Sequence, residues 1–377
     1  MDQFINEAVP KPFQDLLTAL VVELPLTSVS TLRLVDDALS TVRTAVRTHL
    51  NLCAPVNRLP PEVLFAIFDI VRCGFPHCDG VDVGDHAAIL RPDNNSLIAA
   101  THVCRRWRDI AVGYAHLWTS VSTSSPSAPT FFERSRGLPL KVFVALTQGK
   151  PPSIPKHKFL NQFPRIKALH IDLECSWQIR HWKKHLQSLA RSLESLTVVT
   201  CGPQTLLEAN LSMPLGEAFF GAECPVSLKF LSISGTTALL PTDHFPILEY
   251  AHVSAFQAPP GRPFRLEWPA DLLLNTPRLR TFHLHLQSTQ EGFLAERYYP
   301  TQRRIALPMM RHLCITLPQI PTYLRARSTG SGALAAARAM VSTLDMPPTT
   351  VVSIRQGSSC SESSSDTQAG AMPGHLY

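Results

Sequence analysis

The sequence predicts a multi-domain α+β protein, with helices in its N-terminal part and repeated short strands in an α/β region after them. Two observations support this fold class. Apolar residues between positions 28 and 111 recur every three or four residues, which is the period of amphipathic helices. Between positions 163 and 317, a six-residue pattern with apolar residues first, fourth and sixth occurs six times. A chain of 377 residues is long enough for two or three such units.

The N-terminal segment, residues 1–52, is predicted to be helical. A helix over residues 28–50 carries apolar side chains at intervals of three or four positions, with its arginines off the stripe. The stripe consists of Leu32, Val35, Leu39, Val42, Val46 and Leu50. A shorter helix is predicted over residues 13–26, ending near Pro25.

A third helix is predicted to begin at Pro60 and Pro61. The first helical positions need no backbone N–H donor, and proline presets φ for a helix. Glu62 then lies in the first turn, where the helix dipole favours a negative charge. The apolar face that follows consists of Val63, Leu64, Ile67, Phe68 and Val71.

A fourth helix repeats this period after a predicted loop over Arg72–Ser96, which contains Gly, Pro, Asn and Asp. Its apolar positions are Ala100, Val103, Cys104, Trp107, Ile110 and Ala111. Burial of each large apolar side chain is worth roughly 1.5–3 kcal/mol. Two such stripes in so small a unit predict either a small shared core or an interface with another protein.

The two segments resemble the F-box, a module that docks a substrate receptor onto a Skp-type adaptor in cullin-based ubiquitin ligases. The resemblance rests on three motifs in the family's order, Leu59-Pro60-Pro61-Glu62-Val63-Leu64, Val103-Cys104-Arg105-Arg106-Trp107 and Leu117-Trp118. It implies an F-box over residues 53–122. The inserted loop, residues 72–96, departs from the family because it is longer than the usual connection.

Two flanking features resemble a group of F-box proteins abundant in mushroom-forming fungi. One is the helical segment that leads into Pro55, and the other is the run Phe131–Leu140, which precedes a predicted strand over Lys141–Leu146. Adaptor contacts are implied by position in the family at Leu59, Pro60, Val63, Leu64, Ile67 and Phe68. Both core and interface roles are implied for Val103, Cys104, Trp107 and Trp118.

The six-residue pattern is similar to that of leucine-rich repeats, in which each repeat contributes a short strand and a variable return segment. It occurs at Ile166/Leu169/Ile171, Leu193/Leu196/Val198, Leu228/Leu231/Ile233, Leu248/Ala251/Val253, Leu279/Phe282/Leu284 and Met310/Leu313/Ile315. The spacing is irregular, and the asparagine or cysteine that follows the strand in that family is missing. We therefore expect an irregular leucine-rich-repeat-like α/β solenoid over residues 123–325. The alternative is an unrelated α/β domain with several apolar strands.

Residues between the apolar positions are expected on one exposed face, because side chains alternate along a strand. This column would contain His170, Asp172, Thr197, Phe230, Ser232, Tyr250, His252, His283, His285 and His312. The candidate substrate-binding residues among them are His170, Asp172, Tyr250, His252, His283, His285 and His312. Five of the fifteen histidines lie in this column, so one interpretation is a recognition surface that responds to pH. The other is a polar face that recognises nothing.

The C-terminal segment, residues 326–377, is predicted to be a disordered tail, because it is rich in Gly and Ser and has little apolar surface to bury. One short helix is predicted within it, over Ala333–Met340.

Composition and charge argue against several classes of partner. The formal net charge of +6 comes from scattered basic residues, so nucleic-acid binding is not expected. No stretch approaches the ~20 apolar residues that span a bilayer, and the first residues lack the basic region of a signal peptide. The nine cysteines form no C-x-x-C pair, which indicates a reduced, intracellular protein in the cytoplasm, the nucleus or both.

No cofactor, resident metal or catalytic residue is expected. Phosphate-loop, dinucleotide and nucleophile-elbow motifs are absent from the sequence. The spacing of Cys73, His77, Cys78 and His86 matches no common zinc finger. His181 and His185 have helical spacing, but Trp182 stands where a zinc protease needs Glu.

The resemblance implies a substrate-recognition subunit of an SCF-type ligase, in which the F-box binds the adaptor and cullin complex and the repeat-like domain holds an unknown protein target. Such a subunit acts by proximity and needs no catalytic residue of its own. The alternative is a non-catalytic binding scaffold without ligase assembly. A small hydrolase within the C-terminal domain has little support.

Overall fold

The chain forms two compact units in a computed structural model. The first comprises Met1–Ile70 and Asn95–Tyr114, and the second comprises Val71–Asn94 and Ala115–Tyr377. The structure describes residues 11–23, 28–73, 94–146, 162–174, 178–200, 218–221, 223–235, 241–255, 267–286, 304–317 and 331–356. The leading helices belong to the same unit as the first part of the segment predicted to be an F-box.

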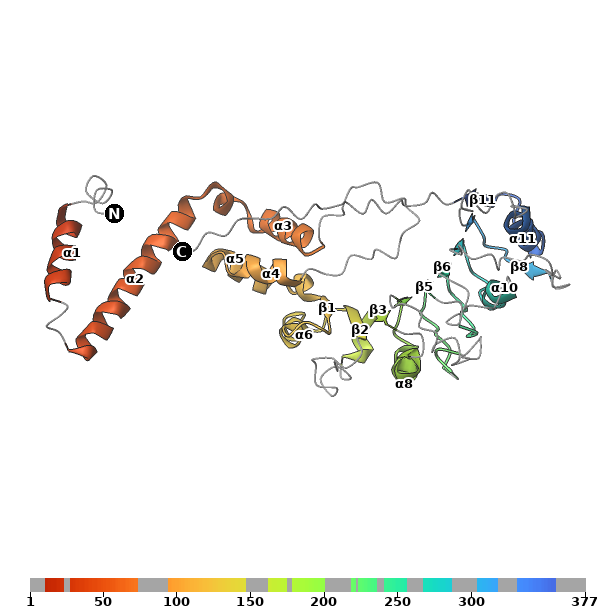
Figure 1. Cartoon of the computed structure of the whole chain (residues 1–377), viewed down its shortest axis with the longest axis horizontal. Coiled ribbons are helices and arrows are strands. Elements are labelled where there is room, and N and C mark those ends of the chain that lie inside the picture. Colours follow the sequence, from red (N-terminus) through yellow and green to blue (C-terminus); the bar gives the residue numbers. More distant parts are fainter. Residues whose placement is uncertain are drawn as a thin grey trace, which may run out of the picture. The chain divides into compact units, whose positions relative to one another are not determined.

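Helices account for the first unit (Figure 1). They are α1 (Lys11–Glu23), α2 (Val29–Cys53), η2 (Pro55–Arg58), α3 (Pro61–Cys73), α4 (Asn94–Thr101) and α5 (Arg105–Gly113). None of the helices in the described ranges has both the length and the hydropathy that a membrane span requires.

The long helix α2 confirms the helix predicted over residues 28–50. The Oγ of Ser28 caps its first turn by accepting a hydrogen bond from the backbone N–H of Thr31, at 3.3 Å. Although its apolar stripe is present as predicted, no residue of α2 is buried. The helix therefore presents its apolar side without cover.

The predicted fourth helix is divided into α4 and α5 by a turn at residues 102–104. Cys104 has an extended backbone, with φ −156° and ψ 169°, and stands at the N-cap of α5. The Nε of Arg108 donates to the carbonyl of Thr101 at 3.0 Å, which satisfies one of the carbonyls that the end of α4 leaves without a helical partner. The sequence did not indicate this break, because the apolar residues keep the same helical spacing through both helices.

The second unit is a mixed α/β region. Its helical elements are η3 (Ala115–Trp118), α6 (Ala128–Arg134), η4 (Phe163–Arg165), α8 (Ile179–Leu189), α10 (Glu267–Leu274) and α11 (Ser331–Ser342). Its strands are β1 (Ser120–Ser122), β2 (Leu140–Leu146), β3 (Ile166–Leu173), β4 (Ser195–Thr200), β5 (Phe230–Gly235), β6 (Tyr250–Ala255), β7 (Thr281–Leu286), β8 (Ile305–Ala306), β9 (His312–Leu317), β10 (Leu344–Asp345) and β11 (Val351–Gln356).

Nine of these strands form one sheet in the order β1-β2-β3-β4-β5-β6-β7-β9-β11, and every pair in it is parallel. Figure 1 shows α8, α10 and α11 along this row of strands. Each strand lies beside the sheet strands that precede and follow it in the chain. The remaining pair, β8 and β10, is also parallel.

All six occurrences of the apolar pattern coincide with strands, β3 to β7 and β9. Their fourth positions pair across the sheet as Leu169, Leu196, Leu231, Ala251, Phe282 and Leu313, and their sixth positions as Ile171, Val198, Ile233, Val253, Leu284 and Ile315. Every apolar residue of the pattern is at most 2% exposed. The strands and their inward positions are therefore as predicted.

The C-terminal segment corrects the prediction of a disordered tail from residue 326. The predicted helix is confirmed as α11, and β11 extends the sheet beside β9. Val352 pairs with Leu313, so Thr349 stands where the preceding strand has Met310. A polar residue at the first apolar position concealed this strand. Residues 357–377 lie outside the described part of the chain.

A row of charged residues lies where the strands begin. Consecutive members are joined by backbone hydrogen bonds, as in Lys229 N–H to Glu194 O at 2.9 Å. Glu194 lies 3.3 Å from the Nζ of Lys167 and 3.8 Å from that of Lys229, and Arg280 lies 3.5 Å from Glu249. Because these side chains are about 40% exposed, each pair contributes little stability, about 0.2–1 kcal/mol.

Candidate protein-docking site

Helix α3 has an inner and an outer face. Leu64 and Phe68 are fully buried on the inner face. Val63 is 43% exposed and Ile70 is 53% exposed on the outer face. Because Val63, Ile67 and Ile70 are three or four residues apart, they lie along one side of the helix.

The inner face of α3 packs against aromatic residues of α5 and its C-cap. The rings of Phe68 and Trp107 lie 5.2 Å apart, and those of Phe65 and Tyr114 stack at 4.6 Å. Leu97 is fully buried in the same unit. Aromatic pairs contribute about 0.5–1.5 kcal/mol beyond their buried area, so these contacts fix α3 against α5.

A buried asparagine joins α2 to this core. The Nε1 of Trp107 donates to the Oδ1 of Asn57 at 2.6 Å, and the Nδ2 of Asn57 donates to the carbonyl of Asn51 at 2.6 Å. Asn57 is 7% exposed, so both of its bonds are shielded from water. The amide therefore holds the C-terminal end of α2 in a fixed position against α5.

An arginine joins the start of α5 to the start of α3. The Nη2 of Arg106 donates to the carbonyl of Leu59 at 2.8 Å. The side chain of Leu59 is half-buried and that of Pro60 is exposed. Both residues directly precede α3. Val103 is 53% exposed in the turn before α5.

We name the outer apolar residues of α3 and of the segment before it the docking face. Its members are Leu59, Pro60, Val63, Ile67 and Ile70. A contiguous apolar surface on a small helical unit marks a protein interaction site. No charged side chain interrupts the series along this side of the helix.

Three of the predicted adaptor contacts do not belong to this face. Leu64, Phe68 and Trp118 are at most 1% exposed, so they hold their surroundings together and present nothing to a partner. In the second unit, the ring of Trp118 meets Phe131 edge to face at 4.8 Å, with the guanidinium of Arg134 4.4 Å from its centre. When apolar residues occur on both sides of a helix, their spacing does not show which side is buried.

The remaining predicted contacts are accessible to different degrees. Leu59, Ile67, Cys104 and Trp107 are half-buried, while Pro60, Val63 and Val103 are exposed. Ile70 was not among the predicted contacts, although its spacing of three from Ile67 and seven from Val63 could have identified it.

The predicted face of polar residues on the sheet is closed in part. His170, Thr197, Ser232 and His252 are at most 7% exposed, which corrects the expectation of one exposed column. The Nε2 of His170 donates to the Oδ1 of Asp172 at 2.7 Å, and the Oγ of Ser232 lies 3.2 Å from the Nδ1 of His252. Alternation along a strand determines on which side of the sheet a side chain lies, but it does not determine whether that side is exposed to solvent.

The accessible part of this column is aromatic. Phe230 is 49% exposed, and its ring lies 6.2 Å from that of Tyr250, which lies 5.6 Å from His283. Tyr250 and His283 are half-buried, as is His285, and His312 is exposed. Burial, with a smaller contribution from Cys314, raises the pKa of Tyr250 to about 12.

A buried carboxylate anchors a turn elsewhere in the second unit. Asp243 accepts hydrogen bonds from the backbone N–H groups of Phe219 and Phe220, at 2.7 and 3.0 Å. Burial raises the pKa of Asp243, and these two bonds oppose the rise. The group is occupied within the fold, so we assign it to structure.

The residues considered as metal ligands do not assemble into a site within the described ranges. His185 packs its ring on Trp182 and Phe163, at 5.3 and 5.6 Å. No group of three or more potential ligands is found among the described residues. His77, Cys78 and His86 lie outside them, as do the side chains of Cys73 and His181.

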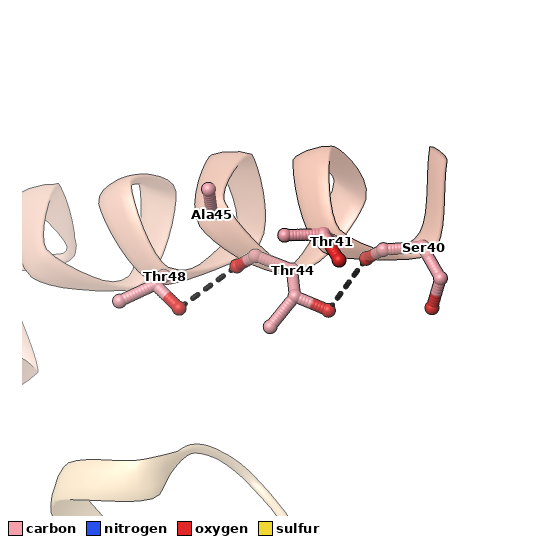
Figure 2. Close-up of a pocket in the computed structure, with 5 residues that line it drawn as sticks. All are labelled: Ser40, Thr41, Thr44, Ala45 and Thr48. Atoms are coloured by element: carbon pink, nitrogen blue, oxygen red, sulfur yellow. Dashed lines mark hydrogen bonds between the residues drawn. The ribbon is translucent and has the colours of Figure 1, made fainter. Parts of the chain in front are cut away.

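A hollow beside α2 is lined by residues of that helix alone, Ser40, Thr41, Thr44, Ala45 and Thr48 (Figure 2). The hydroxyls of Thr44 and Thr48 donate to the carbonyls of Ser40 and Thr44, each at 2.8 Å. Because these hydroxyls donate within the helix, their protons are not available to a ligand. The hollow therefore marks the polar side of α2.

Comparison with known families agrees with the geometry of the helices. Residues 56–124 match the family model described as F-box-like. The matched segment contains α3, α4, α5, η3, β1 and all of η2 except Pro55. No curated protein matches the chain. The F-box-like domain indicates an adaptor-binding role of the SCF type, since domains of this family generally bind Skp-type adaptors.

Proposed function

We propose that this chain is the substrate-recognition subunit of an SCF-type ubiquitin ligase. The observation that carries the proposal is the docking face, an uncovered apolar surface within a segment that matches the F-box-like family. In the proposed complex, the docking face binds a Skp-type adaptor, and the adaptor connects the chain to a cullin. A contact of standard size would bury about 1,600 Å² in total.

The sheet of the second unit is the proposed target-binding domain. Its paired apolar positions and helical or irregular return segments support an irregular leucine-rich-repeat-like solenoid. The target would contact the accessible aromatic residues Phe230, Tyr250 and His283, because tyrosine and other aromatic side chains are enriched at protein interfaces. His170 and His252 are buried and would support this surface from within.

The proposed mechanism is proximity. A target held on the second unit has its lysines at a raised local concentration beside the ubiquitin-conjugating enzyme, so transfer is accelerated without a catalytic residue from this chain. The chain would thus supply binding and positioning, and the partner enzymes would supply the chemistry.

The test is co-purification of the full chain with a Skp-type adaptor and a cullin. We expect the wild-type chain to retain both, and Val63→Asp to reduce adaptor retention at least about tenfold, because it places a charge in the apolar contact. Val226→Asp is the matched control, since Val226 is 49% exposed in the second unit and lies outside the docking face. Circular dichroism melting verifies that both variants fold.

Two results would contradict the proposal. A wild-type chain that retains no adaptor would end the ligase assignment. A wild-type chain that retains adaptor but never cullin would instead favour a binding scaffold without ligase assembly. For the target surface, Phe230→Ala should leave adaptor retention unchanged and reduce proximity labelling of the proteins that the wild-type chain labels.

A further inference from the structure

The apolar side of α2 is a second uncovered surface in the first unit. Leu39 is 48% exposed, Val42 and Val46 are each 52% exposed, and Leu50 is 66% exposed. The helix has 25 residues and is therefore about 37 Å long. A surface of this length, joined through Asn57 to the F-box-like helices, requires an occupant.

The spacing of this stripe is that of a coiled coil. From Leu32 to Val46 its members alternate intervals of three and four residues. The alternation continues with His49 and Cys53, whereas Leu50 lies beside it. We name Leu32, Val35, Leu39, Val42 and Val46 the seam. A strict three–four alternation corresponds to positions a and d of a heptad, which face a second helix of the same kind.

The residues beside the seam identify that second helix as another copy of α2 in antiparallel orientation. In an antiparallel pair, position e of one helix faces position e of the other. Here e is occupied by Asp36 and Arg43, which have opposite charges, so the two-fold symmetry brings Asp36 of each copy beside Arg43 of the other. In a parallel pair, e would face g, where Ala38 and Ala45 offer no charge.

Two further features fit this orientation. Ala38 and Ala45 at position g would face each other across the antiparallel pair, and their small side chains allow the helices to approach closely. A register that pairs Leu39 with Val42 has its two-fold axis beside Thr41, the middle residue of α2, so the copies overlap along their full length. Antiparallel helices also bring opposite dipole ends together.

We propose that α2 is a homodimerisation helix that pairs with α2 of a second copy of this chain, antiparallel, through the seam. The hydroxyl-bearing residues shown in Figure 2, Ser40, Thr41, Thr44 and Thr48, remain on the outside of this dimer. The dimer uses neither the docking face nor the sheet, so it is independent of the proposed ligase function. It would combine two sheet domains in one assembly and raise the avidity for a target that offers two sites.

The test is sedimentation equilibrium of the full chain over a range of concentrations. We expect a dimer for the wild-type chain and a monomer for Leu39→Asp/Val46→Asp. Leu34→Asp is the matched control, because Leu34 is 70% exposed on the same helix but lies off the seam, and this variant should remain dimeric.

Charge exchange tests the orientation. Asp36→Arg alone and Arg43→Asp alone should each raise the dimer dissociation constant about tenfold, because each places like charges together twice. The double variant Asp36→Arg/Arg43→Asp restores opposite charges and should return the constant to within about threefold of the wild-type value.

Either of two results would overturn the proposal. A wild-type chain that stays monomeric up to about 100 μM would mean that α2 is covered by another segment of its own chain or by a different protein. A double charge variant that dimerises no better than the single variants would exclude the antiparallel pairing. Adaptor retention serves as an independent readout, since loss of the dimer should leave it unchanged.

Discussion

The helical unit and the sheet unit treat their apolar residues in opposite ways. In the sheet, every residue of the repeated pattern is at most 2% exposed, and the fourth and sixth positions pair with their counterparts on neighbouring strands. In the helical unit, Val63, Ile70 and Val103 are 43–53% exposed, and α2 buries no residue at all. The sheet covers its own core, whereas the helices leave two apolar surfaces exposed. Loss of an apolar side chain should therefore affect stability in the first case and association in the second.

The largest expected effect comes from the interior of the sheet. Phe282→Ala should lower the free energy of unfolding by about 3–5 kcal/mol, because Phe282 is fully buried and pairs with Ala251 and Leu313. Urea denaturation followed by circular dichroism measures this change. Phe230→Ala is the control on an exposed position of the same sheet, and an equal loss in both variants would contradict the distinction.

Asn57 tests a buried polar side chain that links two helices of the helical unit. Asn57→Ala leaves the Nε1 of Trp107 without its acceptor and should cost about 1–3 kcal/mol in thermal or urea unfolding of this unit. In contrast, Asn51→Ala should have little effect, because Asn51 contributes its backbone carbonyl to this network. Similar losses in the two variants would show that the side-chain amide of Asn57 is not the link.

Tyr250 adds a pH dependence to the sheet unit. Its pKa in the folded state is about 12, above the ordinary value of 10.0, so the folded state favours the neutral phenol. The corresponding stability is fully present below pH 10 and is lost as the pH rises from about 10 to about 12. Because the side chain is only half-buried, we expect a loss of roughly 1 kcal/mol. Urea unfolding of Tyr250→Phe at pH 9 and pH 11 should show a smaller loss than the wild type.

The smallest expected effect comes from the charged row at the start of the strands. Glu194→Gln removes two partly exposed ion pairs and should lower stability by about 0.2–1 kcal/mol, less at high salt. Arg105→Gln, which breaks the more exposed pair with Asp109, should produce no measurable change. A loss above 2 kcal/mol in Glu194→Gln would contradict the small contribution expected of partly exposed ion pairs.

Local periodicity predicted much of this fold. The stripe of α2, the start of α3 at Pro61 and six strands of the sheet follow from spacing, because each is an element whose buried side repeats along the chain. The turn between α4 and α5 could not be predicted from spacing, because the apolar residues of both helices keep the same period across the turn. The strand β11 was also missed, because Thr349 replaces the first apolar residue of its pattern.

The candidate sites were less predictable than the elements that carry them. The sequence identifies the apolar positions of α3 but not which of its two apolar sides is turned inward, so Leu64 and Phe68 were grouped with Val63. The polar column on the sheet was placed on the correct face of the strands. Whether His170 and His252 are accessible depends on packing between residues far apart in sequence, which no single-sequence pattern records.

The order of the strands in the sheet has a consequence for how the chain can change its length. The strands of the sheet lie side by side in the same order as they occur in the chain. A strand and the connection after it therefore form one continuous stretch of sequence that leads to the neighbouring strand. Such a stretch can be duplicated or deleted as a block, and the strands on either side can still meet in the same register. The helical unit has no such freedom, because α3 and α5 share one small core through Phe68 and Trp107, and Asn57 ties α2 to that core. Growth by whole blocks is therefore available to the sheet alone.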